Sequence, residues 1–176
     1  AIQAGIRVFG ENYLQESKKK FAEIPEDVEW HFIGYLQRNK VKEVVGVFEL
    51  IHSVDRLELA EEIDKRAGNK GVVQNVLIQV NLSREETKSG IDRDGAISLA
   101  QKVAEFKNTR LLGLMTIPPY FENPQDSRPF FRNLRELRDE ILREGISLKE
   151  LSMGMSQDFE VAIEEGASIV RIGTAI

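Results

Sequence analysis

The sequence predicts an α/β fold: a barrel of the (β/α)8 type in which strands 2–8 are present and strand 1 is missing. The first observation is an alternation of short apolar strand patterns with helical patterns, at spacings of about 20 to 35 residues. The second is that no hairpin signal such as Asn-Gly separates neighbouring strands, which indicates crossover connections and parallel strands. The third is that the last two strands are followed by turns suited to phosphate, where eight-stranded barrels bind it.

An open, doubly wound sheet is the other fold that such an alternation allows. The strands are short and similar, and their C-terminal ends are repeatedly rich in glycine and polar residues, which favours the barrel. The chain has 176 residues, enough for one good core and too few for two comfortable domains. We therefore expect one barrel domain over residues 1–176.

Four strands are expected in the first half of the chain, over residues 6–10, 29–34, 48–53 and 75–81. The last of these is a nearly unbroken apolar run, which indicates burial on both faces. Helices are expected over residues 13–22, in a short segment after residues 36–40, and from Asp55 onward. In that third helix one face is apolar, made of Leu57, Ala60, Ile63 and Ala67.

The second half continues the alternation. A polar loop over residues 83–94 and a helix over residues 96–106 lead to a strand at 111–116. An amphipathic helix follows and ends near Gly145, with an apolar face made of Phe130, Leu134, Leu137 and Ile141. The last quarter reads as a strand and turn at 151–156, a short helix at 157–166 and a final strand at 169–172.

The two turns of this last quarter predict an anion site. The first turn offers Ser152, Gly154 and Ser156, and the second offers Gly173 and Thr174. A helix that begins at Ser156 would add unpaired N–H groups and the positive end of its dipole, which suits a phosphate. Arg171 lies on the strand that leads into the second turn, and we expect it to point towards the same ligand.

Each of these residues also has a structural interpretation. Ser156 could act only as a helix N-cap, the glycines could be ordinary turn residues, and Arg171 could form an ion pair inside the barrel. His31 and His52 lie in apolar strands, where satisfied core histidines are more common than ligands. Two distant histidines without a compact ligand cluster predict no metal site.

Residues 1–5 have the pattern of a last helical turn that is capped by Gly5 and feeds a strand. We therefore expect the chain to start inside a helix, with strand 1 and most of its helix, on the order of 30 residues, preceding it. Strands 6–9 and 169–172 would then face a gap with unpaired N–H and C=O groups. The bare chain is expected to behave poorly unless another segment fills that gap.

Composition and charge exclude several classes of protein. The net charge of −5 and the lack of any basic run beyond Lys18-Lys19-Lys20 argue against a nucleic-acid partner. Zero cysteines exclude disulfides, thiolate metal sites and thiol catalysis, and they fit a cytoplasmic protein. No apolar run approaches the roughly 20 residues that cross a bilayer, and no signal peptide is visible. We therefore expect no membrane partner.

Six short motifs, in order along the chain, carry a resemblance to a known family. They are Phe9-Gly-Glu-Asn-Tyr13, Trp30-His-Phe-Ile-Gly34 with Leu36-Gln37 and Asn39-Lys40, Lys88-Ser-Gly-Ile91, Gly113-Leu-Met115, Ser152-Met-Gly-Met-Ser156 and Arg171-Ile-Gly-Thr174. Together they resemble the pyridoxal phosphate homeostasis protein family. The resemblance implies the barrel of the alanine racemase N-terminal domain, with pyridoxal 5′-phosphate as cofactor.

The resemblance also implies the cofactor-binding residues. Ser156, Gly173 and Thr174 would hold the phosphate, and Met155 would contribute backbone in the same turn. Arg171 would face the pyridine nitrogen, and Asn12 would bond the side of the ring that carries the phenolic oxygen. His31 and Asn39 are further candidates for the lining of the site.

No catalytic residue is assigned within the chain. The family's cofactor lysine ends strand 1, which would precede this chain, and the family continues beyond Ile176 with a further short helix. Lys40, Lys88 and Lys149 are available amines, but nothing in the sequence indicates a lowered pKa for any of them.

Three functions follow from these expectations. The resemblance favours a protein of cytosolic cofactor homeostasis that holds pyridoxal phosphate and delivers it, with recipient apoenzymes as partners and without established catalysis. It implies a monomer or weak dimer for the intact protein. An amino-acid racemase is the first alternative, but its second base, typically a tyrosine from another domain, has no counterpart in Tyr13, Tyr35 or Tyr120. A non-catalytic interaction module that has lost cofactor binding is the second alternative.

Overall fold

The computed structural model describes residues 1–24, 27–83, 85 and 88–176, and it contains one seven-stranded sheet. The strands pair in sequence order and every pair is parallel: β1 (Val8–Glu11), β2 (Glu29–Phe32), β3 (Leu50–Val54), β4 (Gln74–Val80), β5 (Thr109–Thr116), β6 (Glu150–Met155) and β7 (Ile169–Arg171). A doubly wound sheet reverses its strand order at a switch point. The unbroken order therefore excludes that alternative and confirms the predicted barrel.

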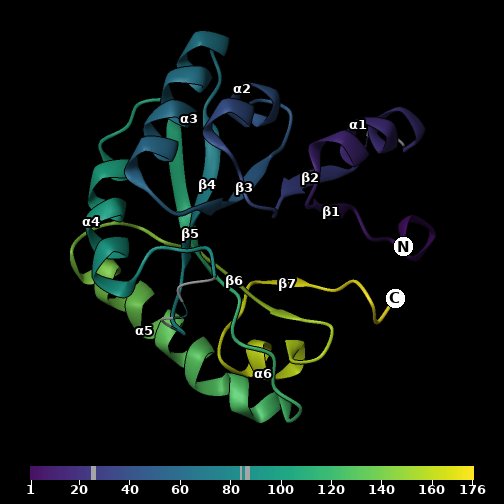
Figure 1. Ribbon diagram of the computed structural model, residues 1–176, viewed down its shortest axis with the longest axis vertical. Helices are drawn as coiled ribbons and strands as arrows, with labels where there is room; N and C mark the ends of the chain where they lie inside the picture. The colour runs from purple at the N-terminus through teal and green to yellow at the C-terminus, as the bar shows by residue number, and fades with distance from the viewer. Residues whose placement is uncertain (25–26, 84, 86–87) are drawn as a thin grey trace.

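The helices cover the outer face of the curved sheet (Figure 1). They are α1 (Leu14–Glu23), α2 (Val41–Val44), α3 (Leu57–Lys70), α4 (Arg93–Ala104), α5 (Arg128–Arg143) and α6 (Phe159–Glu164), with short 3-10 turns η1 (Ile2–Ala4), η2 (Arg38–Lys40) and η3 (Pro124–Ser127). No helix in the described part of the chain is long and apolar enough to cross a bilayer. Gly5 ends η1 with φ +88°, which confirms the expected glycine cap.

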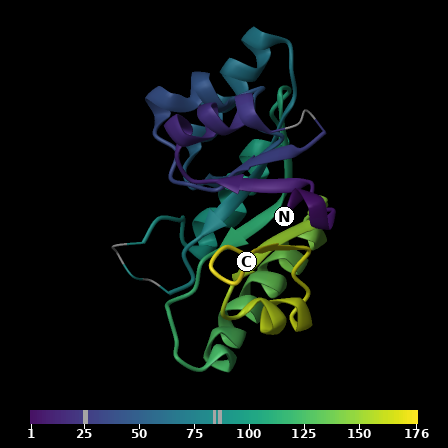
Figure 2. The ribbon, with the colours of Figure 1, turned by 90° about the vertical axis from the view of Figure 1, so that its right-hand side faces the viewer.

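The two ends of the sheet lie on the same side of the molecule. Figures 1 and 2 both place the chain ends there, next to the first and last strands. Within the described residues β1 pairs only with β2, and β7 pairs only with β6. The barrel is thus nearly closed, with an open side between β1 and β7.

Several boundaries differ from the sequence-based expectation. The first strand begins at Val8 rather than at Ile6, and the third extends one residue further, to Val54. The last helix begins at Phe159 rather than at 157, because Asp158 takes the position before it. Residues 84, 86 and 87 of the predicted polar loop lie outside the described residues, and η3 was not foreseen.

The sheet is buried on both faces. Between the sheet and the helices lies the larger core, to which β4 contributes Val76, Ile78 and Val80. Inside the barrel lies a smaller apolar cluster of Leu50, Leu77 and Met115. The alternation along β4 sends Leu77 inward and its neighbours outward, which confirms the expected burial of this strand on both faces.

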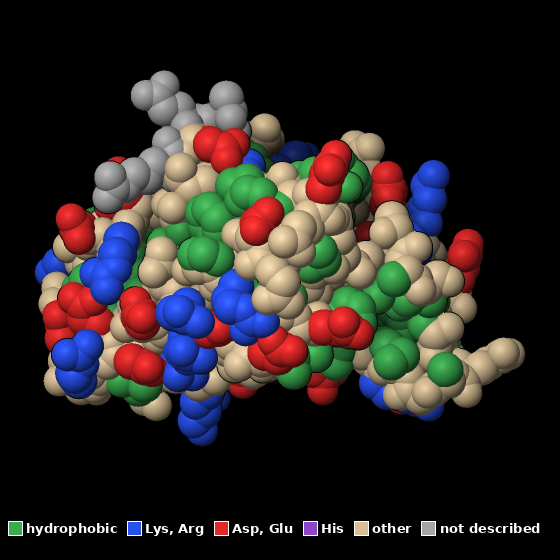
Figure 3. Space-filling view, turned by 90° about the horizontal axis from the view of Figure 1, so that it is seen from below, with side chains coloured by type: hydrophobic (Ala, Val, Ile, Leu, Met, Phe, Trp, Pro, Cys, Tyr) green, Lys and Arg blue, Asp and Glu red, His purple; other side chains and the backbone are tan. Residues whose placement is uncertain are grey.

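A cluster of arginines joins α5 to the turn after α6. Arg128, Arg132 and Arg135 reach Glu165 with N–O distances of 3.0, 3.2 and 3.0 Å, and Arg128 also pairs with Glu164. Burial opposes ionisation of Glu165, but hydrogen bonds from Arg128 and Arg132 outweigh it, so the pKa of the carboxyl lies below its ordinary value. Figure 3 shows basic and acidic side chains interspersed on this end of the molecule. These pairs fix α6, and with it the segment between β6 and β7.

Gly113 makes a close backbone contact that the sheet requires, and we predict that Gly113→Ala destabilises the protein by about 3 kcal/mol or more. The reason is that an added Cβ would lie 1.8 Å from the carbonyl oxygen of Glu150 on the neighbouring strand. Denaturant unfolding of the two proteins measures the change. Gly173→Ala is the matched control for stability, since no atom lies within 4 Å of its added Cβ. Equal stability of both variants would contradict the close contact.

Candidate functional site

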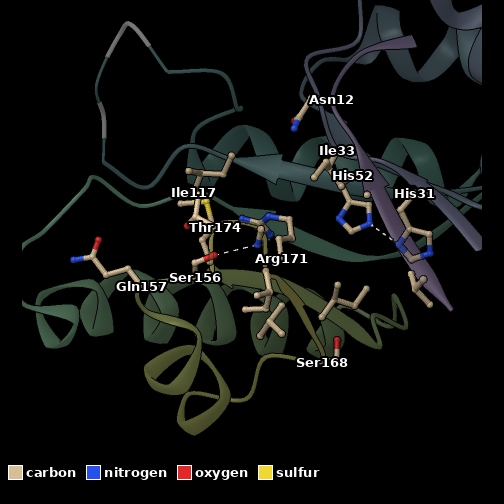
Figure 4. Close-up of a pocket in the computed structure, with 17 residues that line it drawn as sticks. Asn12, His31, Ile33, His52, Ile117, Ser156, Gln157, Ser168, Arg171 and Thr174 are labelled. Atoms are coloured by element: carbon tan, nitrogen blue, oxygen red, sulfur yellow. Dashed lines mark hydrogen bonds between the residues drawn. The ribbon is translucent and has the colours of Figure 1, made fainter. Parts of the chain in front are cut away.

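A cavity of about 770 Å³ lies along the open side of the sheet. It is lined by inward-facing residues of β1, β2, β3 and β7 and by the turns that follow β1, β5, β6 and β7 (Figure 4). All six residues expected at the site line its wall: Asn12, Met155, Ser156, Arg171, Gly173 and Thr174. Residues that are far apart in sequence therefore meet here, because the carboxyl ends of parallel strands lie at one end of the sheet.

The two predicted turns are tied together by the hydroxyl of Ser156. Its Oγ accepts hydrogen bonds from the N–H of Gly173 at 3.0 Å and of Ala175 at 3.3 Å. Thr174 lies between these two donors and is exposed to the cavity. The two hydroxyls and the backbone N–H groups of this turn together form a set of hydrogen-bond donors that fits the oxygens of a phosphate group.

The turn after β6 differs from the prediction in three respects. Ser152 and Gly154 do not belong to the cradle: Ser152 is fully buried, and Gly154 packs its backbone against Ala162 of α6, with φ +93°. The helix does not begin at Ser156, so Ser156 is not its N-cap. The N–H of Met155 donates to the carboxylate of Asp158 at 2.8 Å, and its carbonyl accepts from the N–H of Asp158 at 3.0 Å.

This arrangement removes one expected contribution to anion binding. Helix α6 has only six residues and is preceded by the carboxylate of Asp158, so its dipole is not a feature of the site. The donors that remain come from the backbone of the 173–175 turn and from the two hydroxyls.

Arg171 is the central cation of the cavity (Figure 4). One terminal nitrogen donates to Ser152 Oγ at 2.7 Å and the other donates to the carbonyl oxygen of Thr116 at 2.9 Å. Burial lowers the pKa of Arg171 to about 10, opposed by the charge of Asp158, so the guanidinium stays charged at neutral pH. No ion pair is made by Arg171 in the described part of the chain, so the ion-pair interpretation does not hold there.

Asn12 lies across the cavity from Arg171, on the turn after β1 (Figure 4). Gly34 lets this turn approach the one after β2, because an added Cβ at Gly34 would lie 2.1 Å from the carbonyl oxygen of Asn12. The glycine at position 34 is thus a packing requirement that positions Asn12.

His31, a candidate for the lining by the resemblance, and His52, expected as a core histidine, are both buried side chains of the cavity wall. His31 and His52 both line it, and the Nδ1 of His31 lies 3.1 Å from the Nε2 of His52. The Nδ1 of His52 lies 2.9 Å from Ser152 Oγ. The signal that could have indicated this is the strand alternation, since Leu50 and His52 share the inward face of β3.

The other candidates do not reach the cavity. Asn39 lies in η2, beside a separate shallow hollow with Arg38, Lys42, Glu62 and Arg66. Lys40 pairs with Glu43, and Lys88 pairs with Glu85. Neither of these lysines nor Lys149 is among the residues that line the cavity.

The environment of the histidines keeps them neutral. Burial holds the pKa of His52 well below its ordinary value, and the charges of His31 and Arg171 act in the same direction. Burial also lowers the pKa of His31, against the opposing charges of Glu29 and Glu150. The floor of the cavity therefore carries one positive charge, on Arg171, beside two neutral imidazoles.

Comparison with known proteins gives one consistent result. Residues 1–176 match the family described as alanine racemase, N-terminal domain. The chain is 58% identical to the pyridoxal phosphate homeostasis protein of Aquifex aeolicus over 174 residues, which cover 98% of this chain and 76% of that protein. It is 44% identical to the protein of the same name from Pseudomonas aeruginosa over 177 residues, covering 100% and 76%.

Solved structures agree with these relatives. PipY of Synechococcus elongatus, solved with pyridoxal phosphate bound, is 36% identical and superposes with a TM-score of 0.91, covering 99% of this chain and 83% of PipY. An alanine racemase from Clostridium difficile has a TM-score of 0.83 at 14% identity, with 98% and 45% covered, and this likeness shows the fold alone.

The neutral histidines predict a loss of stability in mild acid. The unfolded chain takes up a proton on each histidine near pH 6.5, whereas the folded chain does so only at lower pH. The contribution of the two neutral histidines to the unfolding free energy is therefore fully present above about pH 6.5. Below that pH the unfolding free energy decreases, by up to about 1.4 kcal/mol per pH unit for each histidine. Urea unfolding between about pH 7 and pH 5 measures the slope.

The matched control is His52→Gln, which removes one of the two titrating groups and should give a shallower slope over the same range. A wild-type free energy that does not change over this range, or an identical slope in the variant, would contradict the assignment of neutral histidines.

Proposed function

The chain belongs to the pyridoxal phosphate homeostasis protein family, and from this membership we propose that it binds pyridoxal 5′-phosphate in the cavity between β1 and β7. The observation that carries the proposal is a half-buried, charged Arg171 without an ion-pair partner in the described residues, next to a turn whose backbone N–H groups and hydroxyls can donate hydrogen bonds to a phosphate. A half-buried cation next to such donors is favourable for an anionic ligand that brings its own charge.

The phosphate would be held by Ser156, Gly173 and Thr174, with Met155 in the same turn. Ser156 and Thr174 supply hydroxyls, and Gly173 supplies a backbone N–H with no side chain in the way. The bonds that Ser156 now makes to the 173–175 turn keep these donors close together. A phosphate oxygen would replace Ser156 Oγ as the acceptor of the Gly173 and Ala175 N–H groups, while the turn that carries them is already in place, which reduces the entropy lost on binding.

The ring would lie between Arg171 and Asn12, with Arg171 at the pyridine nitrogen and Asn12 on the side of the phenolic oxygen. When bound, the cofactor supplies an aldehyde that reacts with amines and a ring that withdraws electrons. Arg171 stays charged at neutral pH and can only donate, so it disfavours a proton on the nitrogen in front of it. A ring without that proton withdraws electrons less strongly, which supports a role in holding the cofactor rather than in demanding catalysis.

The racemase alternative needs two bases on opposite faces of the ring. Tyr13, Tyr35 and Tyr120 are 66%, 56% and 81% exposed, and none of them is among the residues that line the cavity. The alternative of an interaction module that has lost cofactor binding has less support, because the hydrogen-bond donors proposed for the phosphate line the same cavity as Arg171. We therefore favour a cytoplasmic protein that holds pyridoxal phosphate and releases it to recipient apoenzymes, without catalysis of its own.

The proposal predicts that Ser156→Ala combined with Thr174→Ala weakens binding about 10- to 100-fold, because two hydroxyl donors to a charged phosphate are lost. Calorimetric titration with pyridoxal phosphate measures the affinity. Pyridoxine 5′-phosphate is the companion ligand, since it lacks the aldehyde and reports the non-covalent contacts alone.

Ser98→Ala is the control, because Ser98 is exposed on α4 and bonds only to the carbonyl of Asp94 in the described residues. It should leave the affinity for both ligands unchanged. The proposed phosphate site fails if the double variant binds as tightly as the control.

A further inference from the structure

A continuous chain of hydrogen bonds crosses the floor of the cavity. It runs from His31 on β2 to His52 on β3 at 3.1 Å, from His52 to Ser152 on β6 at 2.9 Å, and from Ser152 to Arg171 on β7 at 2.7 Å. Arg171 also donates to the carbonyl of Thr116 on β5. The imidazoles and the hydroxyl are buried, so each proton in the chain must have an acceptor.

The hydroxyl of Ser152 fixes the direction of these bonds. A guanidinium only donates, so Ser152 Oγ accepts from Arg171. The hydroxyl proton then needs an acceptor, and the Nδ1 of His52 is the remaining partner of this oxygen among the described residues. With a proton on Nδ1 of His52, the buried hydroxyl proton would have no acceptor, at a cost of about 1–3 kcal/mol. The proton of neutral His52 is therefore on Nε2.

The same reasoning extends to the second histidine. Nε2–H of His52 donates to Nδ1 of His31, which must then carry a lone pair. Neutral His31 thus has its proton on Nε2. Every donation runs one way, from Arg171 through Ser152 and His52 to His31.

We propose that His31, His52 and Ser152 form a one-way hydrogen-bond relay that orients Arg171 towards the ligand, and that all three are positioning residues for its contact with the pyridine nitrogen. This inference rests on the proposed function. Ser152 offers its lone pair to Arg171 only while its own proton is directed at His52. The orientation of Arg171 therefore depends on the uncharged imidazole of His52, which is two hydrogen bonds away along the relay.

The charged groups around the relay influence the pH at which His52 takes up a proton, and that proton would break the hydrogen bonds of the relay. His31 is influenced by Glu29 on its own strand, by Glu150 on β6 and by His52, while His52 is influenced by His31 and Arg171. A proton added to His52 would place N–H groups on both of its nitrogens. One of these would point at Ser152 Oγ, which already accepts from Arg171, and the hydroxyl proton would lose its acceptor.

Nitrogen NMR of the protein without cofactor tests the relay directly. The chain has two histidines, so His31→Gln and His52→Gln assign both rings. We expect both imidazoles to be neutral at about pH 7 with the proton on Nε2. A proton on Nδ1 of His52, or a charged His52, would overturn the relay whatever the cofactor does.

A pair of substitutions at one position tests the positioning role. Asn places its amide oxygen near the position of Nδ1 and can still accept from Ser152, whereas Gln places its amide near Nε2 and leaves Ser152 without an acceptor. His52→Asn should bind pyridoxal phosphate within about threefold of wild type, and His52→Gln should lose about tenfold. Ser152→Ala, which removes one buried oxygen, should behave as His52→Gln does.

The spectrum of the bound ligand separates positioning from mere packing. In His52→Gln and Ser152→Ala, the pH dependence of the absorption band of bound pyridoxal phosphate should shift, because Arg171 no longer holds the ring nitrogen unprotonated. Equal losses in His52→Asn and His52→Gln, with an unshifted pH profile, would overturn the positioning role. Failure of the unmodified chain to bind pyridoxal phosphate or pyridoxine 5′-phosphate would instead overturn the proposed function itself.

Discussion

The position of the Arg171 guanidinium, half-buried in the cavity wall without a carboxylate partner in the described residues, is the constraint on which the polar interior of this barrel depends. Removing part of a cation from water is costly unless its donors find acceptors, and in the described residues two of the Arg171 donors reach a hydroxyl and a backbone carbonyl rather than a carboxylate. Ser152 must therefore be polar, and its own proton must find an acceptor in His52. The polar floor of an otherwise apolar barrel follows from this single charge.

The surrounding fold holds that charge in place through close packing. Gly113 allows β5 and β6 to approach, so that Thr116 and Ser152 lie on either side of the same guanidinium. On the outer face, three arginines of α5 hold Glu165 after α6, which fixes the chain between β6 and β7. The cradle of Ser156 and the 173–175 turn is thus supported from the helical layer as well as from the sheet.

The chemistry proposed for the site follows from this same arrangement. A family that carries pyridoxal phosphate needs phosphate affinity and a ring of limited reactivity, and a charged arginine at the ring nitrogen is suited to the second requirement. In the proposed complex, an anionic ligand would offset the cost of partly burying Arg171 without a carboxylate. Stability of the protein and affinity for the ligand are therefore connected through one residue.

The sequence by itself determined the order of strands and helices, because apolar periodicity and the missing hairpin turns are local properties. It also singled out Ser156, Gly173, Thr174 and Arg171, which lie in short motifs and line one cavity in the structure, as the candidates for phosphate and ring binding. Only the tertiary structure decided that His52 lines the cavity, that Ser152 is a buried acceptor for Arg171 instead of a part of the cradle, that Asn39 lies elsewhere, and that the last helix begins after Asp158. These outcomes depend on register between strands and on which buried atom faces which, and a hydrogen bond across 100 residues of sequence leaves no periodic pattern in the chain.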